Sequence, residues 1–460
     1  MPYPILEDLF SRAGQPPAGH AITFAGEDPV LPTSFRMGEL GAASIAAAAL
    51  QAGRVLEQRT GRSQAVGVDV DAAAAAMRSW RYVHPVPRVE TGPPPRSVAF
   101  YRTRDERWIF LHRMAPHHFA RQLEVLGCDR SEEALTAAIR TWDAAELEEA
   151  IMTAGACAAM VRTHEEWAQL EQAKALAALP LFSITRTGDS EPEPAGRGER
   201  PLGGVRVLDV TRVLAGPTCA RTLAEHGADV LRISSPMFPD NGQMIQDTGH
   251  GKRSTVLDLR SSDGAAALRR LVAGADVFSQ GYRPGAMDRL GFSPEELAEL
   301  RPGIVSVSIS AFGSAGPWAD RRGFDSVVQS ASGMSHEESS ADGMPHSLPA
   351  NPLDYVTGYL AAFLVGVALE RRAVEGGSWH VELSLAQTGR YLVDLGRVDR
   401  DAAASRPAEL PAERLDALMT TRETGYGTLR HLAPAARMSL TPPRWELPTV
   451  PADHDAPAWW

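Results

Sequence analysis

The chain has 460 residues, of which 44% are hydrophobic, and a formal net charge of -11 at pH 7. This length corresponds to roughly three domain-sized units, with enough apolar residues to bury a sizeable core. The negative balance argues against a general binder of nucleic acid or of membrane surfaces, so a site for an anionic ligand has to be built locally.

Cysteine usage and the first residues favour a cytoplasmic protein. Cys128, Cys157 and Cys219 are far apart and show no CxxC spacing, which excludes a disulfide framework for a chain of this size. The start, "MPYPILEDLFSRAG", has acids where a signal peptide needs a basic and then an apolar stretch. We expect no membrane-spanning segment, because no apolar run approaches the length of a bilayer.

The first part of the chain, residues 1–185, predicts an α+β unit. Ala-rich helical stretches at 38–58 and 142–179 flank a strand-like segment, "RSVAFYRTRDERWIFLHRM". No Gly-rich phosphate loop occurs in this part. Residues 186–200 then replace apolar periodicity with Pro, Gly and charge, which is typical of an exposed linker, and we place the main domain boundary there.

The second part, residues 201–395, predicts a parallel sheet. Short apolar strands are expected at 205–210, 228–233, 275–280 and 303–310, with helix-like segments between them. This alternation implies an α/β fold of the Rossmann-like kind, with helices on both faces of the sheet. An NAD-dependent oxidoreductase would fit the sheet pattern alone, but the chain lacks the GxGxxG turn and the acid that ends the second strand.

Two segments on either side of the linker are similar to each other, although a chance match of short amphipathic segments would give the same pattern. They start at Leu56 and at Leu369, 313 residues later, and both read as a helix end, a Gly turn, a β-like alternation and a second helix. Aligned without gaps, the helical parts place Gly41 opposite Asp354, with Glu39 as the nearest acid. We therefore expect the first segment to have lost the acid.

Asp354 stands at the mouth of an apolar helix-like run, "NPLDYVTGYLAAF". A carboxylate just before a helix faces unpaired backbone N–H groups and the positive end of the helix dipole, which favour its ionised form. The same position suits an ordinary N-cap, so the residue alone leaves both a cap and a nucleophile open.

Five segments follow one another in the second part: "GVRVLDVTRVLAGPTCARTLAEHGADVLRI", "GKRSTVLDLRSSDG", "GYRPGAMDRLGFSPEELAELRPGIVSVSISAFGSAGPW", "RRGFDSVVQSASGM" and "LDYVTGYLAAFLVGVALERR". In this order, over about residues 201–395, they resemble the class III (CaiB/BaiF-type) CoA-transferase family. That family includes formyl-CoA transferase, carnitine CoA-transferase and alpha-methylacyl-CoA racemase. The stretch from about 38 to 185 resembles the later part of the same family.

The resemblance implies a division of the chain into four parts. Residues 1–185 would be a degenerate α+β half copy of the family, fused through the linker 186–200 to a Rossmann-like catalytic large domain at 201–395. Residues 396–460 are too few to form the family's small domain, and we expect them to pack back on the large domain.

The resemblance also implies an enzyme that moves CoA from an acyl-CoA thioester to a carboxylic acid. This reaction requires a nucleophile that forms an anhydride with the acyl group and then a thioester with CoA, and a carboxylate can form both. Asp354 matches the family's nucleophile.

Coenzyme A, entering as the acyl-CoA substrate, is the implied cofactor. Arg212, Ala215 and Gly216 match positions that line the CoA site. Their segment, "VLAGPTCARTL", reads as a strand end, a tight Gly turn and a helix start that offers backbone N–H groups to phosphate. Lys252 and Arg253 either neutralise the nucleotide phosphates or form a solvated basic pair.

Two further positions match CoA contacts of the family, and several positions depart from it. Tyr282 matches an aromatic residue that lies against CoA, and Arg289 matches a basic one. Many members have Asn-Phe where this chain has Gly281 and Tyr282, and Glu where it has Ser234. The Gly-rich loop that shields the intermediate in formyl-CoA transferase has no obvious counterpart.

Other chemistries are less favoured. The racemase branch uses a His where this chain has Phe324, which cannot accept a proton, so alpha-proton exchange is the less favoured activity. The adjacent Asp325 either faces the site or caps a helix. His112, His117 and His118 lack a carboxylate or Cys companion at ligand spacing, so we expect no metal.

Members of the family are interlocked homodimers whose active sites lie between large and small domains. The resemblance therefore implies an interlocked homodimer that acts on acyl-CoA and carboxylic acid substrates, and the fused N-terminal half is a candidate for the small-domain wall. The altered first half leaves one alternative, a catalytically silent subunit that binds CoA or completes a partner's active site. The donor and acceptor acids are not implied.

Overall fold

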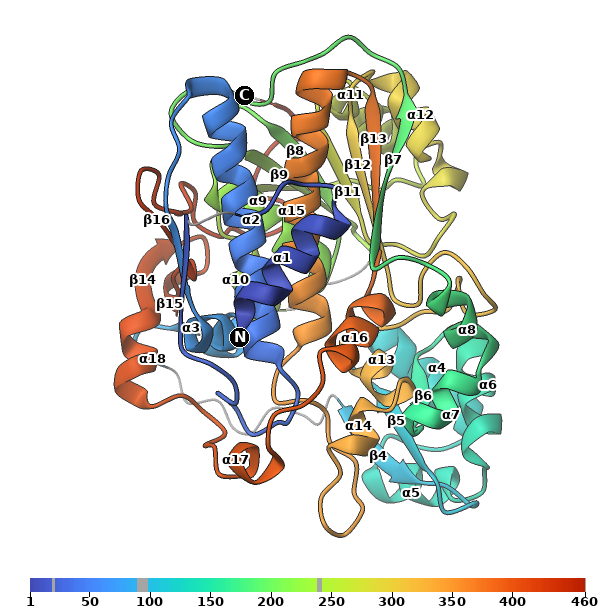
Figure 1. Ribbon diagram of the computed structural model, residues 1–460. Coiled ribbons are helices and arrows are strands. Elements are labelled where there is room, and N and C mark those ends of the chain that lie inside the picture. Colours follow the sequence, from blue (N-terminus) through green and yellow to red (C-terminus); the bar gives the residue numbers. More distant parts are fainter. Residues whose placement is uncertain (19–20, 89–97, 238–241, 460) are drawn as a thin grey trace.

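The computed structural model describes residues 1–460 apart from 19–20, 89–97, 238–241 and 460 (Figure 1). Its largest element is a seven-stranded sheet whose neighbouring strands are parallel except for β13 and β7. In spatial order the strands are β10 (Lys252–Val256), β9 (Asp229–Ser234), β8 (Arg206–Val210), β11 (Val277–Gln280), β12 (Val305–Ser310), β13 (Ser378–Ser384) and β7 (Phe182–Gly188). The predicted parallel α/β sheet is confirmed.

Helices cover both faces of this sheet because successive strand residues point to opposite sides. Val207 of β8 packs in one apolar cluster and the next residue, Leu208, packs in another. The first cluster includes α9 (Ala215–Glu225) and α15 (Pro352–Glu375), and the second includes α11 (Ser262–Val272) and α12 (Pro294–Leu300). Short helices lie between or after these elements: α10 (Gly242–Thr248), η2 (Asp288–Leu290), α13 (Asp325–Ala331), α14 (Met334–Glu337) and α16 (Leu385–Asp394).

The 24-residue helix α15 corrects the expectation that no apolar segment has the length of a membrane span. By length and composition this helix could cross a bilayer, but its whole apolar stretch is buried inside the protein. It packs against α9 and against α2 (Met37–Thr60), which runs beside it in Figure 1. Packing between two layers therefore accounts for its apolar character.

Gly358 sets the close approach of α15 to α9. A Cβ at this position would lie 2.4 Å from the carbonyl oxygen of Ala215, so Gly358→Ala should lower the free energy of unfolding by about 1–3 kcal/mol. Gly53, inside α2, is the matched control: its Cβ would meet its nearest neighbour, Gln64, at 3.6 Å. Gly53→Ala should therefore be neutral or stabilising by about 0.5–1 kcal/mol. Equal losses in urea unfolding of the two variants would contradict this account of the helix crossing.

The N-terminal part contributes helices and strands to two places in the fold. Its first elements, of which α2 packs against α15, are α1 (Pro2–Arg12), β1 (Ile22–Ala25), α2, β2 (Val66–Asp69), α3 (Val70–Ala76) and η1 (Ser79–Tyr82). A small α+β unit with its own apolar cluster follows: β4 (Val98–Arg102), β5 (Trp108–His112), α4 (Pro116–Leu126), α5 (Glu132–Ile139), α6 (Ala144–Thr153) and β6 (Ala158–Met160). Arg96 and Ser97 of the predicted strand segment lie outside the described residues. Helices α7 (His164–Gln169) and α8 (Glu171–Ala177) lead back to the large sheet.

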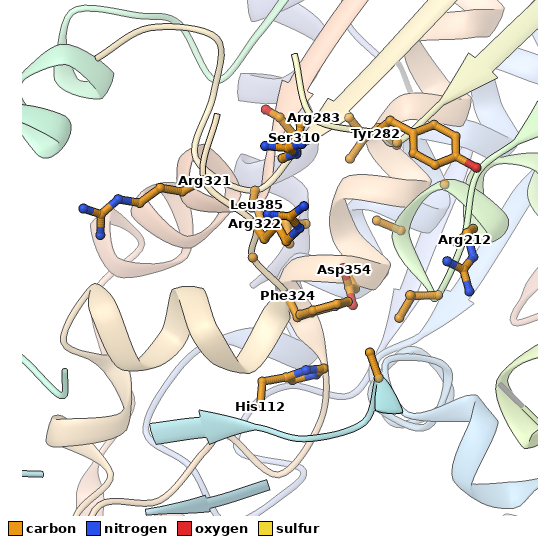
Figure 2. A pocket seen from close by; sticks show the side chains of 18 of the residues that line it. His112, Arg212, Tyr282, Arg283, Ser310, Arg321, Arg322, Phe324, Asp354 and Leu385 are labelled. Atoms are coloured by element: carbon orange, nitrogen blue, oxygen red, sulfur yellow. The ribbon is translucent and has the colours of Figure 1, made fainter. Parts of the chain in front are cut away.

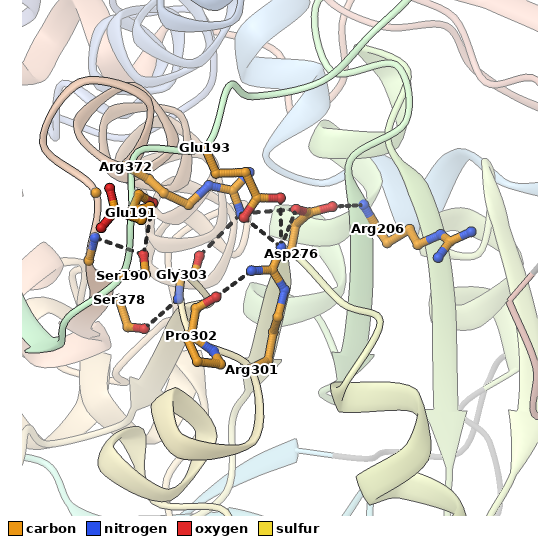
Figure 3. A network of polar contacts seen from close by, with 12 residues as sticks. Ser190, Glu191, Glu193, Arg206, Asp276, Arg301, Pro302, Gly303, Arg372 and Ser378 are labelled. Carbon is orange, nitrogen blue, oxygen red and sulfur yellow. Dashed lines mark hydrogen bonds and ion pairs between the residues drawn. The ribbon is translucent and has the colours of Figure 1, made fainter.

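The predicted boundary at residue 186 falls inside strand β7. This strand pairs antiparallel with β13, so residues before the linker complete the large sheet. The linker itself is anchored by polar contacts (Figure 3). Glu193 pairs with Arg301 at 2.8 Å, and the hydroxyl of Ser190 accepts the backbone N–H of Gly377 at 2.9 Å. The two parts of the chain therefore share one sheet.

The C-terminal residues reach both parts of the chain. Strand β15 (Gly427–Leu432) pairs with β14 (Met419–Thr424) and with β3 (His84–Pro85), and β16 (Ala436–Met438) pairs with β2. Helices α17 (Arg400–Ala404) and α18 (Ala412–Leu418) precede them. Further on, the indole N–H groups of Trp445 and Trp459 donate to the carbonyls of Arg221 and Leu271 in the large domain. Residues 396–460 were expected to pack on the large domain, but only the end of this segment does so.

The order β1-α2-β2-α3 repeats the order β12-α15-β13-α16. In both sets the two strands are parallel neighbours, and a third strand, β16 or β7, pairs antiparallel with the second one. Both long helices have 24 residues and end at a glycine, Gly61 and Gly376. The structure therefore repeats one arrangement on the two sides of the linker.

This repeat corrects the expectation that the first segment has lost its acid. The third residue of α2 is Glu39 and the third residue of α15 is Asp354, so Glu39, not Gly41, is the counterpart. The surroundings agree: the backbone N–H of Glu39 donates to Asp28 at 2.8 Å, and that of Asp354 donates to Asp325 at 3.0 Å. The gapless alignment was displaced by two residues.

Candidate active site

A cavity of about 390 Å³ lies at the carboxyl ends of β8, β11 and β12 (Figure 2). After β8 the chain forms β9 and β10 on one side of β8, and it then returns to form β11 and β12 on the other side. The carboxyl ends at such a switch point are where open α/β sheets bind ligands. The opposite wall comes from the small N-terminal unit, through the segment 112–118. One chain therefore supplies both sides of the cavity.

Asp354 opens into this cavity from the first turn of α15. It is the third residue of the helix, not the residue before it, and the residue is 6% exposed. Burial, and then the nearby carboxylate of Asp325, raise its pKa well above the ordinary value. Loss of solvation and like-charge repulsion therefore oppose the ionised form that the helix start was expected to favour.

A different acid accepts a hydrogen bond from the backbone N–H groups at the start of α15. The Asp325 carboxylate accepts the backbone N–H of Asp354 at 3.0 Å and the side-chain amide of Gln329. Asp325 is buried, burial raises its pKa to about 6, and it does not line the cavity. The alternative left open for Asp325 is thus resolved in favour of a cap. Within the described part of the chain, no donor binds the carboxylate oxygens of Asp354, which leaves them free to react.

Four of the predicted CoA residues lie together on the cavity wall. Arg212 lies in the turn between β8 and α9, Ala215 and Gly216 are the first two residues of α9, and Tyr282 follows β11. The helix start needs glycine at Gly216, because a Cβ there would lie 2.3 Å from the side chain of Thr211. The chain thus brings backbone N–H groups of a helix start to the cavity, as phosphate binding requires.

Lys252 does not reach the cavity, and its predicted contact with phosphate is wrong. It is 2% exposed, and its ammonium group lies 2.7 Å from a carboxylate oxygen of Asp209 and 2.8 Å from the carbonyl oxygen of Pro217. Lys252 thus neutralises the charge of Asp209 beneath the turn between β8 and α9. Arg253 and Arg289 also lie outside the residues that line the cavity, and their contact with CoA stays a prediction.

Several charged residues of the cavity were not found by sequence reasoning. Arg283, Arg321 and Arg322 line it together with Arg212, and they supply the local positive charge that an acidic protein needs for an anionic ligand. Arg321 is already paired with Glu149. Arg283 could have been found, because it follows the end of a predicted strand. The loop containing Arg321 and Arg322 carries no local pattern that would indicate its position.

Histidines of the small unit form the rest of the wall. The ring of His112 stacks on Phe324, with ring centroids 3.9 Å apart and planes 8° apart. Burial lowers the pKa of His112 to about 3, and burial together with nearby cations lowers that of His118 to about 4. Both rings are therefore neutral near pH 7. Among the described residues, no three His, Cys, Asp or Glu side chains gather as metal ligands.

The fold and this cavity define a Rossmann-like α/β protein with a buried carboxylate at the carboxyl ends of its sheet. The model of CoA-transferase family III matches residues 14–189 and 202–429. The chain therefore belongs to CoA-transferase family III, and the resemblance of the five motifs is confirmed.

Several named proteins are similar to parts of the chain. An acetyl-coenzyme A transferase of Hypoxylon pulicicidum is 37% identical over 44% of this chain and 35% of its own length. An acyl-CoA transferase of Gibberella moniliformis is 32% identical over 65% of this chain and 57% of its own length. A succinate–glutarate CoA-transferase of Agrobacterium fabrum is 33% identical over 40% of this chain and 51% of its own length. The matches thus span about a third to three-fifths of these relatives.

A crystal structure of a CAIB/BAIF family protein from Brucella suis is 28% identical over 50% of this chain and 65% of its own. Its TM-score of 0.40 is too low for a comparison of domain arrangement.

Proposed function

We propose that this chain is a CoA-transferase that moves CoA from an acyl-CoA thioester to a carboxylic acid, with Asp354 as the nucleophile. The observation that carries the proposal is a buried carboxylate that opens into the cavity while another acid, Asp325, caps its helix. Membership of CoA-transferase family III supports the same reaction class.

The reaction passes through two covalent states of Asp354. Its carboxylate oxygen attacks the thioester carbonyl, the carbon–sulfur bond breaks, and CoA departs as a thiolate. This step forms an anhydride between the acyl group and Asp354. The thiolate then attacks the aspartyl carbonyl, which releases the first acid and leaves an aspartyl-CoA thioester. The acceptor carboxylate then attacks the aspartyl-CoA thioester, which releases the thiolate and forms a new anhydride. The thiolate attacks the acceptor's carbonyl in this anhydride, which yields the new acyl-CoA and frees the carboxylate of Asp354. No net proton is consumed.

The surroundings of Asp354 favour these steps. A carboxylate with a raised pKa is held in a less stabilised charged state, because burial and Asp325 both oppose its charge. Each covalent intermediate turns Asp354 into a neutral acyl group and removes that repulsion. The geometry therefore destabilises the free carboxylate relative to the intermediates.

The cavity also suits the phosphates and the thiol arm of CoA. The guanidinium groups of Arg212 and Arg283 provide positive charge in the cavity, and the half-buried ring of Tyr282 offers a flat apolar surface. Charge-assisted hydrogen bonds from arginine to phosphate are among the stronger polar contacts. The anionic ligand is thus accommodated despite the acidic composition.

Arg212→Ala should weaken CoA binding about 10-fold or more, because a charge-assisted contact contributes roughly 1.5–3 kcal/mol. Isothermal titration calorimetry with CoA measures this effect. Arg260, an exposed residue paired with Asp258, is the control, and Arg260→Ala should leave the affinity unchanged. Arg289→Ala should weaken binding as well if CoA extends beyond the cavity over η2. Equal affinity of the wild type and the Arg212 variant would contradict the placement of CoA.

The proposed activity is tested by incubating the purified chain with single acyl-CoA thioesters and a panel of carboxylic acids, without ATP, and identifying new thioesters by mass spectrometry. Formation of the acceptor's acyl-CoA supports the proposal. Tight CoA binding without transfer for any acid would favour the alternative, a silent CoA-binding subunit.

A further inference from the structure

Two histidines at the Asp354 end of the cavity are not used by the proposed reaction. His112 and His118 line the cavity but are only 3% and 5% exposed. His112 stacks on Phe324, which directly precedes Asp325, and Asp325 holds the backbone of Asp354. This places the imidazoles on the wall beside the proposed acyl group. Figure 2 shows the ring of His112 directed towards the cavity.

The His112 ring is fixed before any ligand arrives. The side-chain amide of Gln122 donates to the carbonyl oxygens of His112 and Cys157, at 3.0 and 2.8 Å, and so locks the end of β5. The stacked ring of Phe324 fixes the plane of the imidazole. A donor held in this way loses little conformational entropy when it binds a ligand.

The imidazole nitrogens lack the partners that buried polar groups normally have. Nδ1 of His112 and Nδ1 of His118 are enclosed without a hydrogen-bond partner in the described part of the protein. An enclosed nitrogen without an acceptor is better left unprotonated, because orphaned buried N–H donors are rarer than orphaned acceptors. This tautomer places the proton of each ring on Nε2. For His112, which lines the cavity, Nε2 is then the ring nitrogen that can donate to a ligand.

The chemistry of this donor selects a neutral oxygen on the ligand. Both rings stay uncharged near pH 7, because burial lowers the pKa of His112 to about 3, and burial together with His117 and nearby arginines lowers that of His118 to about 4. A neutral imidazole gains less from a carboxylate than arginine does, but it pairs well with a hydroxyl group. Met114 and Leu385, which also line the cavity, suit a short carbon chain around that hydroxyl.

We propose that His112, assisted by His118, recognises a hydroxyl group on the acyl chain, so that the enzyme takes short hydroxy acids in preference to their unsubstituted analogues. This inference rests on the proposed function only in placing the acyl group beside Asp354. His112 is a specificity-determining residue in this account and takes no part in the covalent steps.

The test is a binding measurement that does not depend on turnover. In the Asp354→Asn background, calorimetry compares butyryl-CoA with 2-, 3- and 4-hydroxybutyryl-CoA, and CoA serves as the reference ligand. At least one hydroxylated thioester should bind about 10-fold tighter than butyryl-CoA. His112→Phe, which keeps the stack on Phe324, should remove that difference without changing CoA affinity. His112→Gln, which keeps a donor near the position of Nε2, should retain part of it.

The outcomes separate this inference from the proposed function. It is overturned if no hydroxylated thioester binds more than about twofold tighter, if the preference survives His112→Phe, or if His112→Phe weakens CoA and all thioesters equally. A preference that depends on His112 in a chain without transferase activity would keep this inference and refute the proposed reaction. Transfer activity with no preference would do the reverse.

Discussion

Replacing Asp354 by asparagine should reduce CoA transfer by about four orders of magnitude or more while CoA still binds. An amide cannot form the anhydride and the thioester, and loss of a nucleophile that acts in every covalent step removes most of the rate enhancement. Initial rates of acyl-CoA formation, with calorimetric CoA affinity on the same preparations, measure both quantities. Retention of more than about a tenth of the wild-type rate would show that another group carries the acyl chain.

The same substitution should stabilise the protein at neutral and alkaline pH. The folded-state pKa of Asp354 lies above the unfolded value, so the folded protein binds this proton more tightly than the unfolded chain does. Stability from this group is therefore present below about pH 4 and is lost as the pH rises through the folded pKa. Asparagine is neutral throughout. Asp354→Asn should therefore raise the free energy of unfolding at pH 8, with little change at pH 4. A loss of stability at pH 8 would contradict the burial argument.

The second large effect is expected at Lys252. Its ammonium group neutralises Asp209 and binds the carbonyl oxygen of Pro217, away from water. Among the described residues, Lys252→Met leaves the buried carboxylate of Asp209 with only the backbone N–H and the hydroxyl of Thr211 as donors. Because the carboxylate then loses the counter-charge of Lys252, the substitution should lower the free energy of unfolding by about 3–5 kcal/mol. Urea unfolding measures the change. Arg253→Met, on the next residue of the same strand, is the matched control and should cost much less because Arg253 is only half-buried.

A further variant separates stability from ligand binding. Lys252→Met combined with Asp209→Leu removes both charges and should recover much of the lost stability. If Lys252→Met unfolded like the wild type and instead weakened CoA binding, the phosphate contact expected from the sequence would be correct and the buried pair would not matter.

The parallel sheet was predictable because its strands are short apolar runs separated by helix-length segments, a local pattern. The pairing of β7 with β13 was not predictable, since it joins residues about 190 positions apart and β7 borders a Pro- and Gly-rich linker. The same limit applies to α15. Its apolar length is visible in the sequence, but its burial between α9 and α2 depends on tertiary packing.

The site was predictable where a residue type and a local turn determine it. Asp354 and the turn at Gly216 follow from motifs of the family, and the structure brings them to one cavity. The environment of Asp354 was not predictable, because Asp325 approaches from another helix. Lys252 was misinterpreted, since a basic residue in a strand gives no sign that its partner is Asp209.

The wall that contains His112 was missed for a related reason. The sequence brought the histidine segment to attention only as a poor zinc site, and its contact with Phe324 joins residues more than 200 positions apart. The counterpart of Asp354 in the first segment, Glu39, was missed because gapless alignment ignored a two-residue shift that equal helix lengths reveal.

Trapping of the acyl-enzyme state tests the central claim most directly. The wild type and Asp354→Asn are incubated with a mixed pool of acyl-CoA thioesters, quenched with hydroxylamine, digested and mapped by peptide mass spectrometry. The account predicts a hydroxamate on Asp354 in the wild type and none at position 354 in the variant. A hydroxamate on another carboxylate, or none on Asp354 in wild-type protein that forms new acyl-CoA, would contradict it.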